Sequence, residues 1–338
     1  MPELPEVETI RRGLAQIIVG KTISGQENYN SPKSFPNTQA DVAQFMISAT
    51  VREVRRRAKV LLIDLSSEYT LVIHLKMTGQ LVFIPSETSA GTELPVSGSL
   101  GASGQSVLPR FAGKAKPSSA SSTPASAQDE RFGGGHPSDS FIHALPDNTT
   151  RQRIDFGDGS HLYFNDLRKF GWIKLYPSIE VSNIDFMQRV GLEPLAEAFT
   201  NPEFISRVRR RNGTTIKAAI LDQTVLAGVG NIYADESLWG AKIHPATRVR
   251  EVSDNQLATL LEQIKFVMNL SIEKGGSTDK NYVDAEGKKG SYLAFANVFR
   301  REGKPCQRHP DVLIEKSRVA GRGTHVCPVC QPVPKYNQ

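Results

Sequence analysis

The chain of 338 residues has few cysteines and no long apolar run, and both shortages restrict its class. Its three cysteines all lie after residue 305, which suits a metal site better than a disulfide framework. No stretch of 18 or more apolar residues occurs, so a membrane-spanning helix is not expected. The first residues include Glu3, Glu6 and Glu8, where a secretory peptide would carry Lys or Arg. The sequence therefore predicts a soluble protein of the cytoplasm or the nucleoid.

Positive charge is concentrated in the second part of the chain, and the net charge is +6. Residues 1–201 carry 20 Lys and Arg against 21 Asp and Glu, whereas residues 202–338 carry 21 against 14. The basic part is a candidate surface for a polyanion such as a nucleic acid. A solvated basic face that binds nothing is the alternative that charge alone leaves open.

The first eight residues carry the pattern with the clearest chemical meaning. Removal of Met1 would leave the secondary amine of Pro2 as the chain terminus, beside the carboxyl groups of Glu3 and Glu6. A terminal amine titrates near pH ~8, so part of it is unprotonated at neutral pH and can form a Schiff base with a sugar carbon. Glu3 and Glu6 would then transfer protons. The alternative is an ordinary helix start, with Pro5 in the first turn and the acidic side chains complementing the helix dipole.

The spacing of apolar residues predicts an α+β protein of several domains. Residues 5–19 have the three- and four-residue spacing of a helix. Runs rich in Val, Ile and Leu predict an antiparallel β-sandwich or barrel, and they lie at 60–65, 71–75, 81–84, 162–164 and 172–176. From residue 201 the pattern becomes helical, with candidate helices at 204–211, 215–221, 231–239 and 254–271.

A low-complexity segment interrupts the β-rich part. Residues 86–140 hold 13 Ser, 8 Gly and 5 Pro among 55 positions, with few large apolar side chains. We interpret residues 86–148 as a disordered insertion between two strands. The expected domains are a catalytic β-sandwich domain with flanking helices at 1–201, a helical DNA-binding domain at 202–298 and a C-terminal finger at 299–338.

Seven motifs in order give the chain a resemblance to a known family. They are PELPEVET at 2–9, HLKMTG at 74–79, NDLRKFG at 165–171, GVGNIY at 228–233, GGST at 275–278, GKPC at 303–306 and GRGTHVCPVC at 321–330. Each is weak alone, but their order and rough spacing hold over nearly the whole chain outside 86–150. The chain resembles the bacterial formamidopyrimidine-DNA glycosylases of base-excision repair. The resemblance implies excision of oxidised purines such as 8-oxoguanine and formamidopyrimidines from double-stranded DNA, followed by β- and δ-elimination at the abasic site.

The resemblance also implies the catalytic residues. Pro2 would be the nucleophile at C1′ of the damaged nucleotide, Glu3 the acid and base, and Glu6 an assisting group. Lys59 matches the family's catalytic lysine, which contacts the lesion and its phosphate. Charge alone would favour a solvated strand end for this residue.

By the same resemblance the DNA-binding residues are His74, Met77, Arg168, Phe170, Asn231 and Arg322. Met77, Arg168 and Phe170 would fill the gap left by the everted nucleotide, although Met and Phe are more often core residues. The turn at 228–231 resembles a helix-two-turn-helix, whose glycines let the backbone approach a phosphate. Ser277, Thr278 and Tyr282 would lie in the loop over the everted base.

The candidate metal site departs from the family pattern of four cysteines. This chain has Cys306 and His309, then Cys327 and Cys330 after a gap of 17 residues. Both pair spacings and both ligand types suit one structural Zn²⁺ in a β-hairpin zinc finger. The alternative is a degraded, metal-free finger with His309 on its surface.

Two rival functions stay open at the level of sequence. One is an endonuclease VIII-like glycosylase for oxidised pyrimidines, but that branch has Gly where Leu4 stands here. The other is a non-catalytic protein that binds damaged DNA, against which the presence of Pro2, Glu3 and Lys59 counts. In either case we expect a monomer that needs no organic cofactor.

Overall fold

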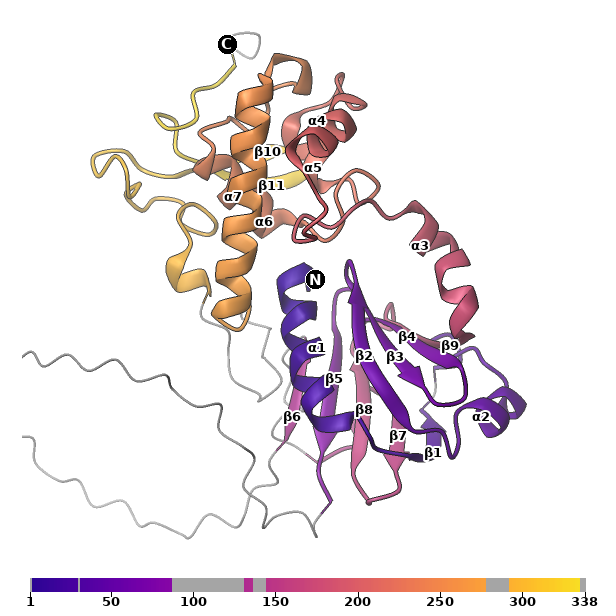
Figure 1. Ribbon diagram of the computed structural model, residues 1–338. Helices are drawn as coiled ribbons and strands as arrows, with labels where there is room; N and C mark the ends of the chain where they lie inside the picture. Colours follow the sequence, from indigo (N-terminus) through magenta and orange to yellow (C-terminus); the bar gives the residue numbers. More distant parts are fainter. Residues whose placement is uncertain (1, 30, 87–130, 136–143, 278–291, 335–338) are drawn as a thin grey trace, which may run out of the picture.

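The computed structural model describes residues 2–29, 31–86, 131–135, 144–277 and 292–334. They form a β-rich lobe and a helical lobe, and α1 begins where the two meet (Figure 1). Among the described helices, none combines the length and the apolar character needed to cross a bilayer.

The β-rich lobe is a sandwich of two antiparallel sheets, as expected. Its strands are β1 (Ile23–Asn28), β2 (Val51–Arg57), β3 (Val60–Leu65), β4 (Tyr69–His74), β5 (Gly79–Ile84), β6 (Phe132–Gly135), β7 (Thr150–Phe156), β8 (His161–Asp166) and β9 (Trp172–Pro177). One sheet has the order β1-β7-β8-β5-β6, and the other has the order β2-β3-β4-β9. The short helix α2 (Gln39–Phe45) also belongs to this lobe.

Alternating side chains fill the space inside the sandwich. Leu61 and Ile63 of β3 and Leu81 of β5 are buried in one apolar cluster, because every second residue of a strand faces the same side. Helix α1 (Leu4–Ile18) adds Ile10 and Leu14 to that cluster, which confirms the predicted helical spacing.

Part of the expected disordered insertion belongs to the sheet, so that interpretation was wrong for residues 132–135. They form β6, which pairs with β5, and Phe132 packs against the sandwich core. A Cβ on Gly133 would lie 2.0 Å from the carbonyl oxygen of Leu81, so this close pairing requires glycine. The low-complexity composition hid a strand. Positions 87–130 and 136–143 of the predicted insertion lie outside the described residues.

The helical lobe follows a linker of η3 (Ser178–Asn183) and α3 (Asp185–Arg189). Its elements are α4 (Asn201–Arg209), α5 (Ile216–Leu221), α6 (Asn231–Gly240), η4 (Val249–Glu251), α7 (Asp254–Glu273), η5 (Tyr292–Phe295), β10 (Glu315–Val319) and β11 (Arg322–Val326). The four helices predicted from sequence are all present. Strands β10 and β11 form the antiparallel hairpin expected for the finger.

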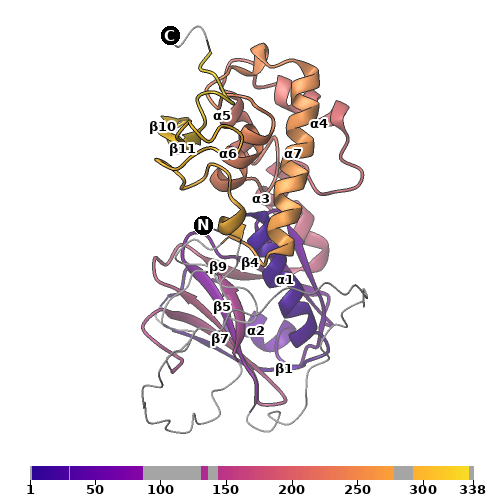
Figure 2. The ribbon, with the colours of Figure 1, turned by 90° about the vertical axis from the view of Figure 1, so that its left-hand side faces the viewer.

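The start of α1 connects the two lobes (Figures 1 and 2). Leu4 lies in the apolar core of the helical lobe, whereas Val7 lies in the sandwich core. The backbone N–H of Leu4 donates to the carbonyl of Gly228, with N and O 3.0 Å apart. The first residues of the chain are therefore fixed by both lobes.

Candidate functional site

The Glu6 carboxylate, which is almost fully buried, joins several segments at the junction of the lobes. Its Oε2 accepts the backbone N–H of Glu3 at 2.8 Å. Its Oε1 accepts the Tyr233 hydroxyl at 2.5 Å and the backbone N–H of Ser277 at 2.9 Å. The Tyr233 hydroxyl also lies 2.5 Å from the Ser271 hydroxyl oxygen. Glu6 thus fixes the chain start against α6 and the end of α7.

Glu3 keeps one carboxylate oxygen without a partner. Its Oε1 accepts the backbone N–H of Ile232, in the first turn of α6, at 3.2 Å. Its Oε2 is buried and has no hydrogen bond within the described part of the chain. Burial raises the pKa of Glu3 to about 7, although the positive charge of Lys59 opposes the shift. A carboxyl group with such a pKa can both give and take a proton at neutral pH.

Two glycines let the chain start approach the turn before α6. A Cβ on Gly230 would lie 2.2 Å from the carboxyl carbon of Glu3. Gly228 has φ +90°, and a Cβ there would lie 2.5 Å from Cβ of Leu4. The sequence suggested that these glycines admit a phosphate. In the structure they first make room for residues 3 and 4.

Lys59 lies between β2 and β3 and points into the junction, not into solvent. Only 6% of the residue is exposed, and Nζ donates to the carbonyl of Val229 at 3.1 Å. Burial lowers the pKa of Lys59, the charges of Glu3 and Glu6 raise it, and the charge of Arg322 lowers it further. The alternative of a solvated strand end is therefore excluded, and the lysine shares its site with the two carboxyl groups.

Met77, Arg168 and Phe170 meet on the surface from two separate turns. Met77 is 43% exposed and Phe170 is 54% exposed, which excludes the core positions that their types would favour. The Arg168 guanidinium lies 5.0 Å from the centre of the Phe170 ring and 3.5 Å from the Met77 sulfur. Asp166 fixes both turns, since it accepts bonds from the Thr78 hydroxyl and from the Arg168 N–H.

His74 ends β4 with a neutral, buried ring. Burial lowers its pKa to about 3, and the charges of Lys76 and Lys59 act in the same direction. Its Nδ1 accepts the backbone N–H of Lys76 at 3.1 Å. A neutral imidazole whose Nδ1 is an acceptor carries its proton on Nε2, so the ring can donate one further hydrogen bond.

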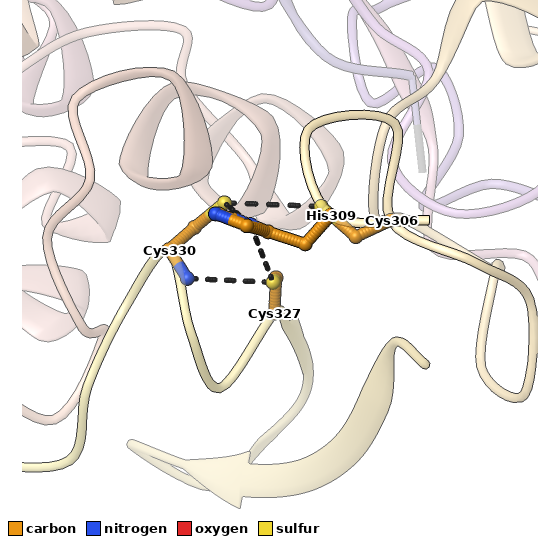
Figure 3. A group of neighbouring side chains, drawn as sticks. All are labelled: Cys306, His309, Cys327 and Cys330. Atoms are coloured by element: carbon orange, nitrogen blue, oxygen red, sulfur yellow. Dashed lines mark hydrogen bonds between the residues drawn. The ribbon is translucent and has the colours of Figure 1, made fainter. Parts of the chain in front are cut away.

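The four predicted metal ligands converge at the end of the hairpin (Figure 3). Their ligand atoms all lie within 4.8 Å of one another. The Sγ atoms of Cys306 and Cys330 are 3.8 Å apart, and Cys330 Sγ lies 3.2 Å from His309 Nδ1. A tetrahedral site with metal–sulfur bonds of about 2.3 Å needs ligand separations of about 3.8 Å. The three cysteines are not joined by disulfides. The cluster can therefore hold one metal ion.

Comparison with known proteins places this geometry in a family. Residues 1–173 match the model of the formamidopyrimidine-DNA glycosylase N-terminal domain, and residues 190–282 match that of the formamidopyrimidine-DNA glycosylase H2TH domain. The chain belongs to the formamidopyrimidine-DNA glycosylase family.

Curated relatives and solved structures from this family match the chain along nearly its whole length. The formamidopyrimidine-DNA glycosylase of Herpetosiphon aurantiacus is 37% identical over 332 residues, which are 98% of this chain and 100% of the relative. That of Pelotomaculum thermopropionicum is 34% identical over 334 residues, with coverage of 98% and 100%. The Lactococcus lactis Fpg protein, solved in complex with DNA that contains an abasic site, is 27% identical in sequence. The match covers 98% of this chain and 100% of that chain, with a TM-score of 0.75.

The formamidopyrimidine-DNA glycosylase fold brings most predicted site residues together. Glu3, Glu6, Lys59 and the backbone of Ser277 lie at the junction, and Pro2 is buried beside them. Thr278 and Tyr282 lie outside the described residues. Sequence reasoning missed Tyr233, the partner of Glu6. Its place in the GVGNIY motif was visible, but only the fold shows the contact across 227 positions.

The raised pKa of Glu3 predicts a pH-dependent cost in stability. The unfolded chain loses this proton near pH 4.5 and the folded chain near pH 7, so the free energy of unfolding falls as pH rises through that interval. Glu3→Gln cannot ionise, and it should be more stable than the native protein at pH 8, by up to a few kcal/mol. At pH 4 the two should be nearly equal. Urea unfolding at both pH values measures the difference, and an equal gain at both would contradict the shift.

Proposed function

We propose that this chain is a DNA glycosylase and abasic-site lyase that removes oxidised purines from double-stranded DNA in base-excision repair. The observation that carries the proposal is the buried Glu3 carboxyl group, with a pKa of about 7 and one unpartnered oxygen, beside Pro2 and Lys59. Family membership and the DNA complexes of the similar Lactococcus lactis Fpg protein support it. Because the proposed substrate is DNA, we propose that the protein acts in the cytoplasm, where the DNA lies.

In the proposed reaction the Pro2 nitrogen, freed by removal of Met1, attacks C1′ of the damaged nucleotide. The bond to the base breaks, and the departing base takes up the proton that the Pro2 nitrogen loses. Glu3 gives its proton to the ring oxygen of the sugar, and the ring opens to an iminium ion between Pro2 and C1′. Loss of a C2′ proton then expels the 3′ phosphate, and a second elimination expels the 5′ phosphate. Glu6 holds the backbone N–H of Glu3 and so keeps the acid in place.

Several cationic and polar groups fit the phosphates around the reacting sugar. Lys59 would contact the lesion and its phosphate from within the junction. His74 would donate from Nε2, while Asn231 and Arg322 would bind from α6 and the hairpin. Ser277, Thr278 and Tyr282 are proposed for the loop over the everted base. A bent duplex would then contact both lobes at once.

We propose domain limits at 1–201, 202–298 and 299–338, and one structural Zn²⁺ in the last domain. Cys306, His309, Cys327 and Cys330 would hold the ion, since their types and separations suit a closed tetrahedral site. Bound Zn²⁺ supplies no catalytic step here, and its contribution is to fold the finger. The apolar contacts of this part are few, with Trp239, Val298 and Ile314 as the main ones besides the cysteines.

Arg168→Ala should reduce discrimination for the base opposite the lesion. A guanidinium that enters the gap can pair with the orphaned cytosine, and a bidentate contact typically provides ~1–3 kcal/mol of discrimination. The ratio of excision rates for 8-oxoguanine opposite cytosine and opposite adenine should fall by about 10-fold. Arg189→Ala, on an exposed arginine that pairs with its helix neighbour Asp185, is the matched control. Equal rates for all opposing bases in the native protein would contradict this role.

Cleavage of duplexes with defined lesions tests the proposed function. The native protein should cut DNA with 8-oxoguanine or a formamidopyrimidine opposite cytosine and leave phosphate on both ends of the gap. Preference for an oxidised pyrimidine would favour an endonuclease VIII-like activity. Binding to both duplexes without cleavage would favour a non-catalytic protein.

A further inference from the structure

A fully buried ion pair fastens the β10–β11 hairpin to the helices. Lys217 lies on α5 and Asp235 on α6, and both side chains are 0% exposed. Nζ of Lys217 lies 2.7 Å from Oδ1 of Asp235. The same ammonium group donates to the Gly323 carbonyl at 3.1 Å and to the Thr324 hydroxyl at 2.8 Å. Its three protons thus have three acceptors, two of them on β11.

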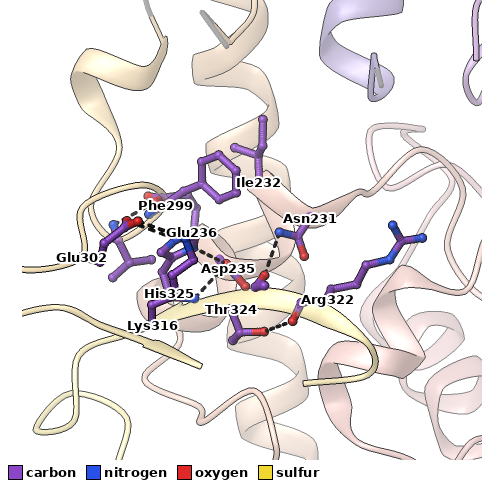
Figure 4. Close-up of polar contacts among 12 residues, drawn as sticks. Asn231, Ile232, Asp235, Glu236, Phe299, Glu302, Lys316, Arg322, Thr324 and His325 are labelled. Atoms are coloured by element: carbon purple, nitrogen blue, oxygen red, sulfur yellow. Dashed lines mark hydrogen bonds and ion pairs between the residues drawn. The ribbon is translucent and has the colours of Figure 1, made fainter. Parts of the chain in front are cut away.

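The second carboxylate oxygen of Asp235 holds the next residue of the same strand (Figure 4). It accepts the backbone N–H of His325 at 3.0 Å, and it lies 3.1 Å from Nδ1 of the same residue. The Asn231 side chain donates to the Gly323 carbonyl at 2.9 Å. Positions 323, 324 and 325 are therefore each fixed by a side chain of α5 or α6.

These bonds act on the residues that directly follow Arg322. The Thr324 hydroxyl also donates to the Arg322 carbonyl at 3.0 Å, so the network reaches the arginine backbone itself. The Arg322 side chain extends from the start of β11 (Figure 4). The positive charge of Arg322 lowers the pKa of both Lys59 and Lys217.

A buried ion pair is a costly way to join two elements. The free-energy cost of removing two charges from water offsets much of their attraction. Replacing such a pair with apolar residues of the same volume often leaves stability unchanged or raises it. Apolar contacts have no preferred direction, whereas Lys217 and Asp235 each form hydrogen bonds with defined atoms of β11. The pair is therefore suited to setting the orientation of the hairpin.

We propose that Lys217 and Asp235 are positioning residues that hold Arg322 where its guanidinium can contact a DNA phosphate. The inference rests on the proposed phosphate contact of Arg322. It separates two functions along β11, since the metal ligand Cys327 follows one end of the strand and Arg322 stands at the other. The ion pair sets the position of the arginine, and the metal site folds the segment beyond it.

A double-mutant cycle on DNA affinity tests this inference. The neutral pair Lys217→Met with Asp235→Asn keeps volume and leaves an amide oxygen that can accept the backbone N–H of His325. The Kd for a duplex with a tetrahydrofuran abasic analogue, measured by fluorescence anisotropy, should rise about 10-fold or more. Arg322→Ala should have a similar effect. In the Arg322→Ala background the neutral pair should cause no further loss.

Additive losses in the cycle, or an unchanged Kd in the neutral pair, would overturn the inference. Lys316→Met is the matched control, because Lys316 lies on β10 of the same hairpin and its ion pair with Glu302 is exposed. It should leave Kd unchanged. Thr324→Val removes one acceptor without touching either charge, and it should give a smaller loss that also disappears without Arg322. This variant decides the question if the neutral pair does not fold.

Two further readouts separate the possible failures. Metal content should stay the same in the neutral pair, and its loss would show that the hairpin as a whole had come apart and would overturn the inference. Cleavage of lesion DNA by the native protein tests the proposed function alone. If the losses of DNA affinity are additive and the native protein still cleaves lesion DNA, only the positioning role is refuted.

Discussion

Glu3→Gln is expected to slow base excision by ~10²–10⁴-fold, the usual contribution of a general acid or base, while DNA affinity stays within about 2-fold. The amide has the shape of the carboxyl group and can still accept the N–H of Ile232. It cannot give a proton to the opening sugar. Single-turnover cleavage of 8-oxoguanine DNA and anisotropy titration measure the two quantities separately.

Glu8→Gln is the matched control for that experiment. Glu8 lies in α1, which begins directly after Glu3. Burial raises the pKa of Glu8, but hydrogen bonds from Arg11, Arg12 and Arg56 outweigh that effect and lower the pKa to about 2. It is ionised at neutral pH and has no proton to give. Its loss should affect stability and leave the excision rate within about 3-fold. Equal losses of rate in both variants would indicate a general effect of α1 and not acid catalysis by Glu3.

Removal of the metal is expected to have the second large effect. Chelation or Cys327→Ser should lower DNA affinity ~100-fold or more, because the finger has too few apolar contacts to keep its fold without the ion. His309→Cys should retain the metal, since a thiolate replaces an imidazole as ligand. His309→Ala should weaken metal binding, since no ligand takes its place.

Metal analysis by atomic emission, together with anisotropy titration, checks these outcomes. The native protein should contain one equivalent of zinc. Active protein without stoichiometric metal would refute the site and restore the alternative of a degraded finger. Unlike metal removal, the neutral Lys217 and Asp235 pair should weaken DNA binding with the zinc still present.

Features that depend on residues close together in the sequence could be predicted from it. The helix at the chain start and four of the later helices followed from spacing, and the cluster of candidate metal ligands followed from residue type and spacing. Glu3 and Glu6 were predicted from the residues at the chain start and Lys59 from the family resemblance, and the structure brings the three together. The strand β6 was missed because glycine is needed there by close pairing with β5, while its composition is typical of loops.

Contacts between distant positions could not be predicted in this way. Lys217 lies on a short helix where a lysine usually faces solvent, and only the packing of β11 against α5 and α6 buries it. The same holds for Asp166, which joins two surface turns, and for Tyr233, which binds Glu6. Gly228 and Gly230 had a local explanation as phosphate contacts, but the structure adds a steric one through Leu4 and Glu3.

Borohydride trapping on DNA with 8-oxoguanine opposite cytosine, followed by mass spectrometry of the digested adduct, tests the proposed chemistry most directly. Reduction of the iminium ion should leave the DNA remnant on the nitrogen of Pro2 in a chain that lacks Met1. Pro2→Gly should weaken trapping, and blocking the terminal amine should abolish it. An adduct on Lys59, undiminished when the terminus is blocked, would contradict the assignment of Pro2 as the nucleophile.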